Sequence, residues 1–228
     1  GSDVIYGDDP FAPDAYSGND VLSGGDGADL IVGQNGDDIL YGGNGDDGGS
    51  DSARLVGGAG DDILFGDSGN DYLFGDADDV HASNHGNDRL FGGADDAGND
   101  RLEGGGGADI LDGGEGDDTL IVDAEDTVNW RAETGTDFVV GADALINMVG
   151  VDSSSITITQ AVDPNLGDLL VVNSGQSYLA LAAGALSANS SYSLSGEVLD
   201  QAEFMKLSSA LDIDATQGSD EIYGSDQA

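Results

Sequence analysis

The chain has 228 residues, of which 46 are Asp or Glu and only 5 are Lys or Arg, so its formal net charge is −41 at pH 7. That charge repels nucleic acid and anionic membrane surfaces, which excludes both as expected partners. The chain has no Cys, which excludes a disulfide scaffold, a thiolate metal site and a thiol nucleophile. No run approaches the roughly 18 apolar residues of a membrane span, so we expect no membrane insertion by this segment.

The composition also requires a counter-ion. Hydrophobic residues make up 38% of the sequence, which is too many for a purely disordered acidic chain. Self-repulsion among the carboxylates opposes compaction, so a cation must neutralise them if the chain is to fold. Carboxylate and backbone carbonyl oxygens are the ligands in excess, and hard divalent cations such as Ca²⁺ prefer these ligands.

A nine-residue repeat organises residues 7–121 into ten turns. Its pattern is G-G-x-G-x-D-x-(Leu/Ile)-x. Six strict units start at Gly24, Gly33, Gly57, Gly66, Gly104 and Gly113. Four longer units start at Gly7, Gly42, Gly75 and Gly92, and we place their insertions in the turns, at residues 10–17, 45–53, 78–85 and 95–97.

The eighth position of every unit is apolar. The residues there are Leu22, Ile31, Leu40, Leu55, Leu64, Leu73, Leu90, Leu102, Leu111 and Leu120. The flanking positions are mixed, which is the out-in-out pattern of a very short strand. Short strands joined by six-residue turns predict a flattened solenoid of two parallel sheets, with successive units on opposite sides.

These units resemble the RTX (repeats-in-toxin) nonapeptides of haemolysin-type bacterial exoproteins, over about residues 1–122. The resemblance implies an all-β fold, a right-handed parallel β-roll stabilised by Ca²⁺. It also implies a secreted or cell-surface protein that leaves the cell by type I secretion. Each ion is expected between turns two units apart, with the sixth-position Asp of both turns as ligands.

Carried onto this chain, the resemblance gives two edges of metal-binding aspartates. One edge has Asp20, Asp38, Asp62, Asp88 and Asp109, the other has Asp29, Asp47, Asp71, Asp100 and Asp118, and Asp3 and Asp220 occupy the same position in terminal partial units. The turn glycines expected to complete the sites are Gly24, Gly25, Gly27, Gly33, Gly36, Gly42, Gly43, Gly45, Gly57, Gly58, Gly60, Gly66, Gly69, Gly104, Gly105, Gly107, Gly113, Gly114 and Gly116.

Five stacked turns leave four gaps on each edge, so the expected number of calcium ions is at most about eight. A single such Asp could equally be a solvated turn carboxylate, but ten in register favour ligands. Asp47 has an alternative frame, in which Gly48 and Gly49 begin the turn and Ala53 takes the sixth position.

The nonapeptide pattern stops after residue 122. We expect a β-rich capping domain over residues 123–215, with strands at 137–140, 156–159, 169–172 and 178–181 and one helix near 198–211. Segments such as 150–156 and 167–172 resemble the haemolysin-type calcium-binding-related domain, whose expected role is to cover the end of the solenoid. Residues 216–228 read as the start of a further repeat, because 218–224 resemble 1–7, which predicts a tandem exoprotein.

Several features keep more than one interpretation. His81 and His85 could bind a transition metal or simply lie in an exposed loop. The apolar stripe of Ile39, Tyr41, Ile63, Phe65 and Phe91 could bind a sugar or a partner, or be covered by the same chain. We find no catalytic constellation, so the predicted function is a calcium-binding structural or interaction module, not an enzyme. The alternatives are a calcium-dependent carbohydrate-binding accessory module, with polysaccharide or neighbouring modules as partners, and an enzyme in the second half.

Overall fold

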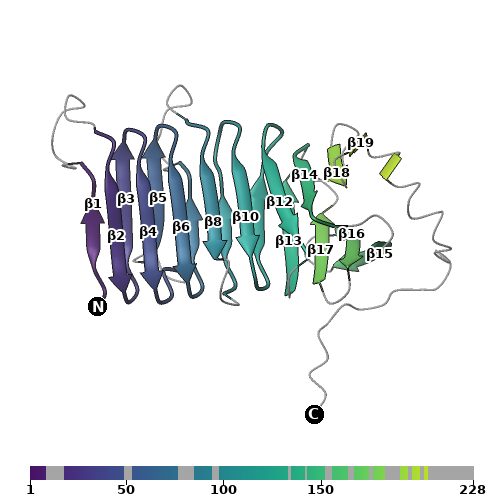
Figure 1. Ribbon diagram of the computed structural model, residues 1–228, viewed down its shortest axis with the longest axis horizontal. Helices are drawn as coiled ribbons and strands as arrows, with labels where there is room; N and C mark the ends of the chain where they lie inside the picture. Colours follow the sequence, from purple (N-terminus) through teal and green to yellow (C-terminus); the bar gives the residue numbers. More distant parts are fainter. Residues whose placement is uncertain are drawn as a thin grey trace, which may run out of the picture.

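The structure is a computed structural model that describes residues 1–8, 18–48, 53–76, 85–93, 98–132, 135–141, 143–151, 156–163, 167–174, 177–182, 191–194, 197–200 and 203–204. These residues form two long sheets that make a flattened roll, with β1 and β2 at one end and β15 to β19 at the other (Figure 1). This arrangement confirms the predicted all-β parallel β-roll. No helix in this part of the chain is long and apolar enough to cross a membrane.

The roll strands alternate between the two sheets along the chain. Sheet A contains β1 (Val4–Tyr6), β3 (Leu30–Asn35), β5 (Arg54–Ala59), β7 (Tyr72–Phe74), β9 (Arg101–Glu103), β11 (Thr119–Val122) and β13 (Gly135–Gly141). Sheet B contains β2 (Val21–Asp26), β4 (Ile39–Asn44), β6 (Ile63–Ser68), β8 (Arg89–Gly93), β10 (Ile110–Gly114), β12 (Thr127–Arg131) and β14 (Leu145–Val149). Each strand pairs in parallel with the strand two units away.

The eighth-position side chains stack in register to form the core. In sheet B, for example, Leu40 is paired with Leu64 and Leu64 with Leu90. From Ile31 to Leu120 these side chains are almost completely buried, while Leu22, near the open end, is only half-buried. One apolar layer per turn therefore fills the space between the sheets, which explains why this position is never polar.

The parallel roll does not stop at residue 122, where the predicted capping domain begins. Strand β12 pairs in parallel with β10, β13 with β11, and β14 with β12. These three turns lack the double glycine but keep a buried apolar residue at the eighth position, in Val128, Val139 and Ile146. A single apolar cluster runs from Ile31 to Phe204, so the second half shares the core of the roll.

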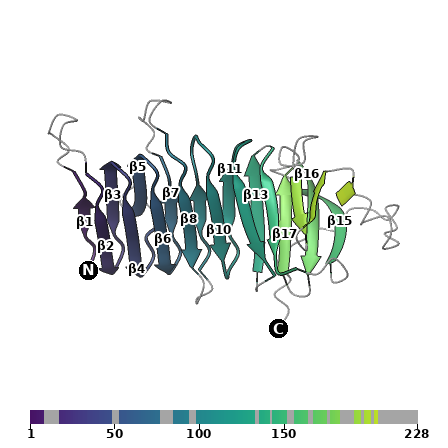
Figure 2. The ribbon, with the colours of Figure 1, turned by 45° about the horizontal axis from the view of Figure 1, so that its top comes forward.

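Beyond β14 both sheets change to antiparallel pairing. Strand β17 (Ser177–Ala182) is parallel to β13 but antiparallel to β16 (Gly167–Ser174), which pairs with β15 (Ile156–Asp163). Strand β18 (Ser191–Leu194) is parallel to β14 and antiparallel to β19 (Glu197–Asp200). Figure 2 shows β17, β16 and β15 following β13 at the end remote from β1.

The sequence-based strands of the second half lie within β13, β15, β16 and β17. The helix expected near 198–211 differs, because its first residues belong to the strand β19. Residues 203 and 204 have helical backbone, and the rest of that range lies outside the described residues. The segment 216–228 also lies outside them, as do residues 10–17, 49–52, 78–84 and 95–97 of the insertions.

Candidate metal sites along the turn edges

The sixth-position aspartates form a ladder along each edge of the roll. In each rung, the backbone N–H of one Asp donates a hydrogen bond to Oδ1 of the Asp two turns further along the chain. The bonds from Asp20 to Asp38, from Asp38 to Asp62 and from Asp62 to Asp88 are 2.7–2.8 Å long. The other edge repeats the pattern from Asp3 to Asp118, with bonds of 2.6–2.9 Å. The same carboxylates therefore connect every pair of stacked turns.

The second oxygen of eight of these carboxylates has no donor within the described residues. Oδ2 is buried without a hydrogen-bond partner, within the described residues, in Asp20, Asp29, Asp38, Asp47, Asp62, Asp88, Asp109 and Asp118. A buried carboxylate oxygen without a partner costs free energy, and one such oxygen per turn would destabilise the roll repeatedly. The regular recurrence of this atom indicates a ligand that the protein itself does not provide.

The first glycine of each unit leaves room beside this oxygen. A Cβ added at Gly7 would lie 2.6 Å from Asp20 Oδ2 and 2.6 Å from the carbonyl oxygen of Gly33. Gly24, Gly33, Gly57 and Gly75 have the same two kinds of neighbour, their own Asp and a glycine carbonyl of the stacked turn. Carboxylate and carbonyl oxygens therefore converge where only hydrogen occupies the glycine side-chain position.

The turn backbone needs glycine at its second and fourth positions for a different reason. Gly25 and Gly27 have φ of 96° and 134°, a region that residues with a Cβ rarely adopt. Where the second glycine is missing, Gln34 and Asp67 still adopt φ of 85° and 70°. The turn conformation is thus imposed by the stacked neighbours, and the glycines lower its cost.

Burial changes the ionisation of the ladder carboxyls. Desolvation raises the pKa of Asp62 and of Asp88 to about 8, and the negative charges of neighbouring aspartates add to the effect. Burial likewise raises the pKa of Asp109 to about 7. Without a cation these groups favour the protonated form near neutral pH, whereas an adjacent divalent cation would favour the carboxylate.

This donor set fits a hard divalent cation such as Ca²⁺. It offers oxygen atoms only, from carboxylates and from backbone carbonyls of glycine-rich turns. In the described part of the chain, no group of three or more His, Cys, Asp or Glu side chains could by itself hold a metal ion. A site on these edges would therefore use two aspartates and complete its shell with carbonyl oxygens.

The structure places eleven of the twelve sequence-predicted aspartates in the ladders. Asp47 accepts from Asp29 and donates to Asp71, which matches the first frame and not the frame with Ala53 at the sixth position. Asp3 begins one ladder by donating to Asp29 but is itself exposed. Asp220 lies outside the described residues.

Two ladder aspartates were missed by the glycine pattern. Asp126 accepts the N–H of Asp109 at 3.0 Å, and Asp137 accepts the N–H of Asp118 at 3.1 Å. Their turns begin with Ile121 and Ala132 instead of glycine. A search for an Asp followed two positions later by an apolar residue, as in 126–128 and 137–139, could have identified both from the sequence.

Of the two histidines that could bind a transition metal, His85 lies within the described residues. His85 Nδ1 lies 3.4 Å from Asp76 Oδ2, and the N–H of Gly106 donates to the same oxygen at 2.8 Å. His81 lies outside the described residues. Asp76 and His85 thus pack against the stacked turn at Gly105 and Gly106 at the base of the insertion.

The apolar stripe forms a column of stacked rings on sheet B. Tyr41 and Phe65 have ring centroids 5.1 Å apart with planes 7° apart, and Phe65 and Phe91 are 5.1 Å apart at 12°. Stacking occupies both faces of Phe65 and one face each of Tyr41 and Phe91, so those faces are not available to a sugar ring. Tyr41 is 36% exposed, and Phe65 and Phe91 are half-buried.

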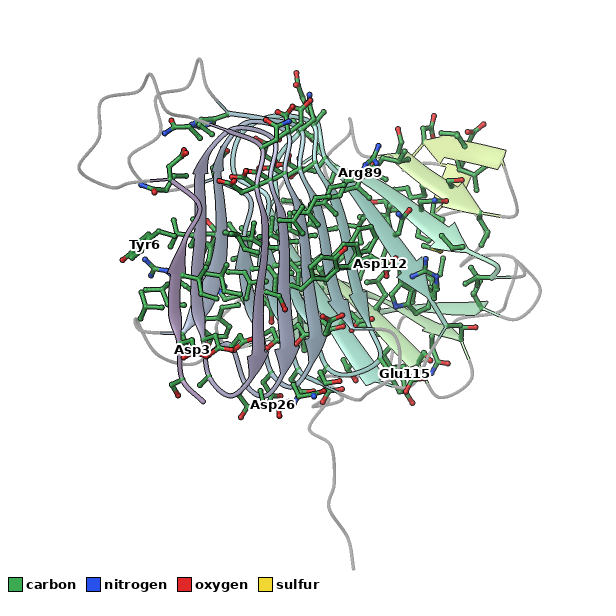
Figure 3. All side chains as sticks on the ribbon, turned by 60° about the vertical axis from the view of Figure 1, so that its left-hand side comes forward. Asp3, Tyr6, Asp26, Arg89, Asp112 and Glu115 are labelled. Carbon is green, nitrogen blue, oxygen red and sulfur yellow. The ribbon has the colours of Figure 1, made fainter. Side chains whose placement is uncertain are left out.

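Acidic side chains also cover the outside of both edges. Figure 3 shows Asp26 and Glu115 on the turns along one edge, far apart along the roll. Arg89, by contrast, projects from strand β8, and Arg131 on β12 pairs with Asp112 on the flat face of sheet B. The negative potential is therefore concentrated at the turns, where the unpartnered oxygens lie.

Comparison with known proteins agrees with this geometry. A family model for the RTX calcium-binding nonapeptide repeat, which spans four copies, matches residues 14–48, 47–80 and 84–120. No curated protein matched the chain. The RTX repeat is a non-catalytic structural element that binds calcium. Up to about residue 120, this chain is therefore a series of RTX calcium-binding nonapeptide repeats that form a calcium-binding structural module.

Proposed function

We propose that this chain is a calcium-folded structural and interaction module of a large secreted bacterial exoprotein, such as an adhesin, a surface-layer protein or a toxin. The observation that supports this most directly is the row of buried, unpartnered Asp oxygens along both edges. Each of them would cost free energy in a metal-free roll and stabilise a calcium-bound one.

The proposed ligands follow from the ladder geometry. In each gap, Oδ2 of one Asp, the carboxylate of the next Asp on that edge and the carbonyls of the intervening glycine turns face each other. Asp20 to Asp109 and Asp29 to Asp118 enclose four gaps per edge, which corresponds to about eight ions. Charge neutralisation at these gaps offsets the repulsion of a chain with a net charge of −41.

Calcium dependence would let the chain fold outside the cell but not in the cytosol. In a cytosol poor in calcium the carboxylates repel one another, which keeps the chain loosely collapsed and suits export as an unfolded polypeptide. Outside the cell, where calcium is abundant, ion binding supplies the missing folding free energy. The family match supports this setting, because RTX repeats are typical of secreted proteins.

A calcium titration followed by far-UV circular dichroism tests the proposal, with Mg²⁺ as the control cation and native mass spectrometry to count ions. The expected result is a cooperative gain of β-sheet signal with several Ca²⁺ bound, and no such gain with Mg²⁺. A spectrum that does not respond to calcium would refute the proposed function.

A further inference from the structure

Both aspartate ladders continue for one rung beyond the matched repeats. The family match ends at residue 120, and the next turns on the two edges contain Asp126 and Asp137. Each of these aspartates is buried, with 1% and 8% exposure, and each accepts the N–H of the preceding ladder Asp. The stacking that defines the earlier gaps is therefore repeated in turns without the glycine motif.

The two last gaps contain the same unpartnered atom as the earlier ones. Asp109 Oδ2 and Asp118 Oδ2 are buried without a hydrogen-bond partner, in residues only 1% and 0% exposed. In the earlier rungs this oxygen lies between the first glycine of its own turn and the stacked turn. Asp109 and Asp118 also hold their Oδ2 against the first glycine of their own turn, Gly104 and Gly113, but no glycine carbonyl of the next turn is among the nearest atoms there. The carboxyl groups of Asp109 and Asp126 lie within hydrogen-bonding reach of each other, as do those of Asp118 and Asp137.

The far side of each new rung is closed by the protein. Asp126 Oδ2 accepts the backbone N–H of Asp123 at 2.7 Å, and Asp137 Oδ2 accepts the indole Nε1–H of Trp130 at 2.8 Å. On the sheet B edge, the following turn has the buried Ala144 immediately before β14, where earlier turns have Asp. Each ladder therefore ends at a carboxylate whose outer oxygen has its own donor.

We propose that the chain has two calcium sites outside its recognised repeats, one between Asp109 and Asp126 and one between Asp118 and Asp137. Trp130 and the Asp123 amide close the two ladders among the described residues. The inference rests on the proposed calcium-dependent fold but adds sites that the repeat pattern does not assign. It raises the expected capacity by one ion per edge.

The position of Trp130 provides a local probe, because it is the only tryptophan in the chain. Tb³⁺ replaces Ca²⁺ in oxygen sites and emits when a nearby excited indole transfers energy to it. Excitation at the red edge of the absorption band selects tryptophan over tyrosine. The site at Asp118 and Asp137 lies next to the indole, so it should dominate the sensitised emission of the whole chain.

Asp137→Asn is the test variant and Asp117→Asn is its matched control, since Asp117 is an exposed carboxylate next to Asp118, on the turn against which the turn of Asp137 stacks. The expected result is Tb³⁺ emission that Ca²⁺ displaces, that falls several-fold in D137N and that persists in D117N. Emission of equal strength in a folded D137N variant would overturn the assignment of this site.

Native mass spectrometry of Asp126→Asn tests the other edge, and it remains informative if D137N does not fold. We expect one calcium ion fewer than in the unsubstituted chain, while circular dichroism still shows a folded roll. An unchanged ion count in folded D126N would overturn the second site. If the unsubstituted chain bound no calcium, the proposed function would fail; calcium binding without these two changes would refute only the added sites.

Discussion

The backbone N–H of Asp62 donates to Oδ1 of Asp88 at 2.8 Å, while Oδ2 of the same Asp88 is buried without a donor. One carboxylate thus has two functions, since one oxygen fixes the spacing of two turns and the other faces a gap between turns. A substitution at this position should therefore affect calcium binding and stacking together, which leads to the first prediction.

Asp88→Asn should weaken calcium-dependent folding. Asn keeps a carbonyl oxygen for the N–H of Asp62 but loses the negative charge that would face the cation. A charge-assisted ligand contributes about 1.5–3 kcal/mol, so the calcium midpoint should rise about tenfold or more. Calcium titration by circular dichroism measures this. Asp61→Asn is the control, because Asp61 is an exposed carboxylate beside Asp62, on the turn against which the turn of Asp88 stacks. The calcium midpoint of D61N should hardly move. Equal shifts in both variants would contradict the ladder assignment.

Gly57→Ala should destabilise the roll although the backbone there needs no positive φ. The added Cβ would collide with Asp62 Oδ2 and lie 2.6 Å from the Gly75 carbonyl oxygen. Overpacking of this kind costs about 1–3 kcal/mol, and it would also narrow the gap for a cation. Thermal unfolding in saturating calcium measures the loss. Gly18→Ala is the matched control, since an added Cβ at Gly18 meets nothing within 4 Å.

Leu90→Ala should create a cavity between the sheets. Leu90 is 0% exposed and stacks between Leu64 and Leu111. Such truncations cost about 2–5 kcal/mol, so the unfolding temperature in saturating calcium should drop markedly. Val21→Ala removes apolar atoms from a side chain that is 71% exposed and should have little effect. A small loss for L90A would mean that the core layers pack loosely.

The stability of the metal-free fold should rise as the pH falls, whereas calcium binding should weaken. Burial raises the pKa of Asp62 and Asp88 to about 8 and that of Asp109 to about 7, above the ordinary pKa of 3.8 for an Asp side chain. The metal-free fold therefore binds more protons than the unfolded chain between about pH 4 and 8, and its stability falls as pH rises through that window.

Circular dichroism in the presence of a chelator should show β-sheet signal increasing as the pH falls from about 8 to 5. Calcium affinity should fall over the same range, because protons compete for the ligand oxygens. A metal-free spectrum that is independent of pH would show that the ladder carboxyls are not buried in the absence of calcium.

How much could be predicted from the sequence depends on which interactions are local. The nine-residue period, the apolar eighth position and the sixth-position Asp are visible in the sequence because every turn repeats the same environment. From these alone follow the two sheets, the alternation of strands between them and the two acidic edges. The insertion that the sequence placed at 45–53 did not disturb the repeat, since Asp47 within that range keeps its place in the ladder and Leu55 after it keeps its place in the core.

The extent of the roll was decided only by tertiary structure. Asp126 and Asp137 lie in turns without double glycines, and their strands pair in parallel because the preceding strands present open edges with matching apolar layers. The antiparallel strands β15 to β19 join the same sheets, although nothing local in their sequences selects that edge. The sequence by itself determined the repeating unit of this protein. The tertiary structure decided where the repetition ends and which groups close the two ladders, namely Trp130 and the Asp123 amide. The reason is that strand pairing is a non-local interaction.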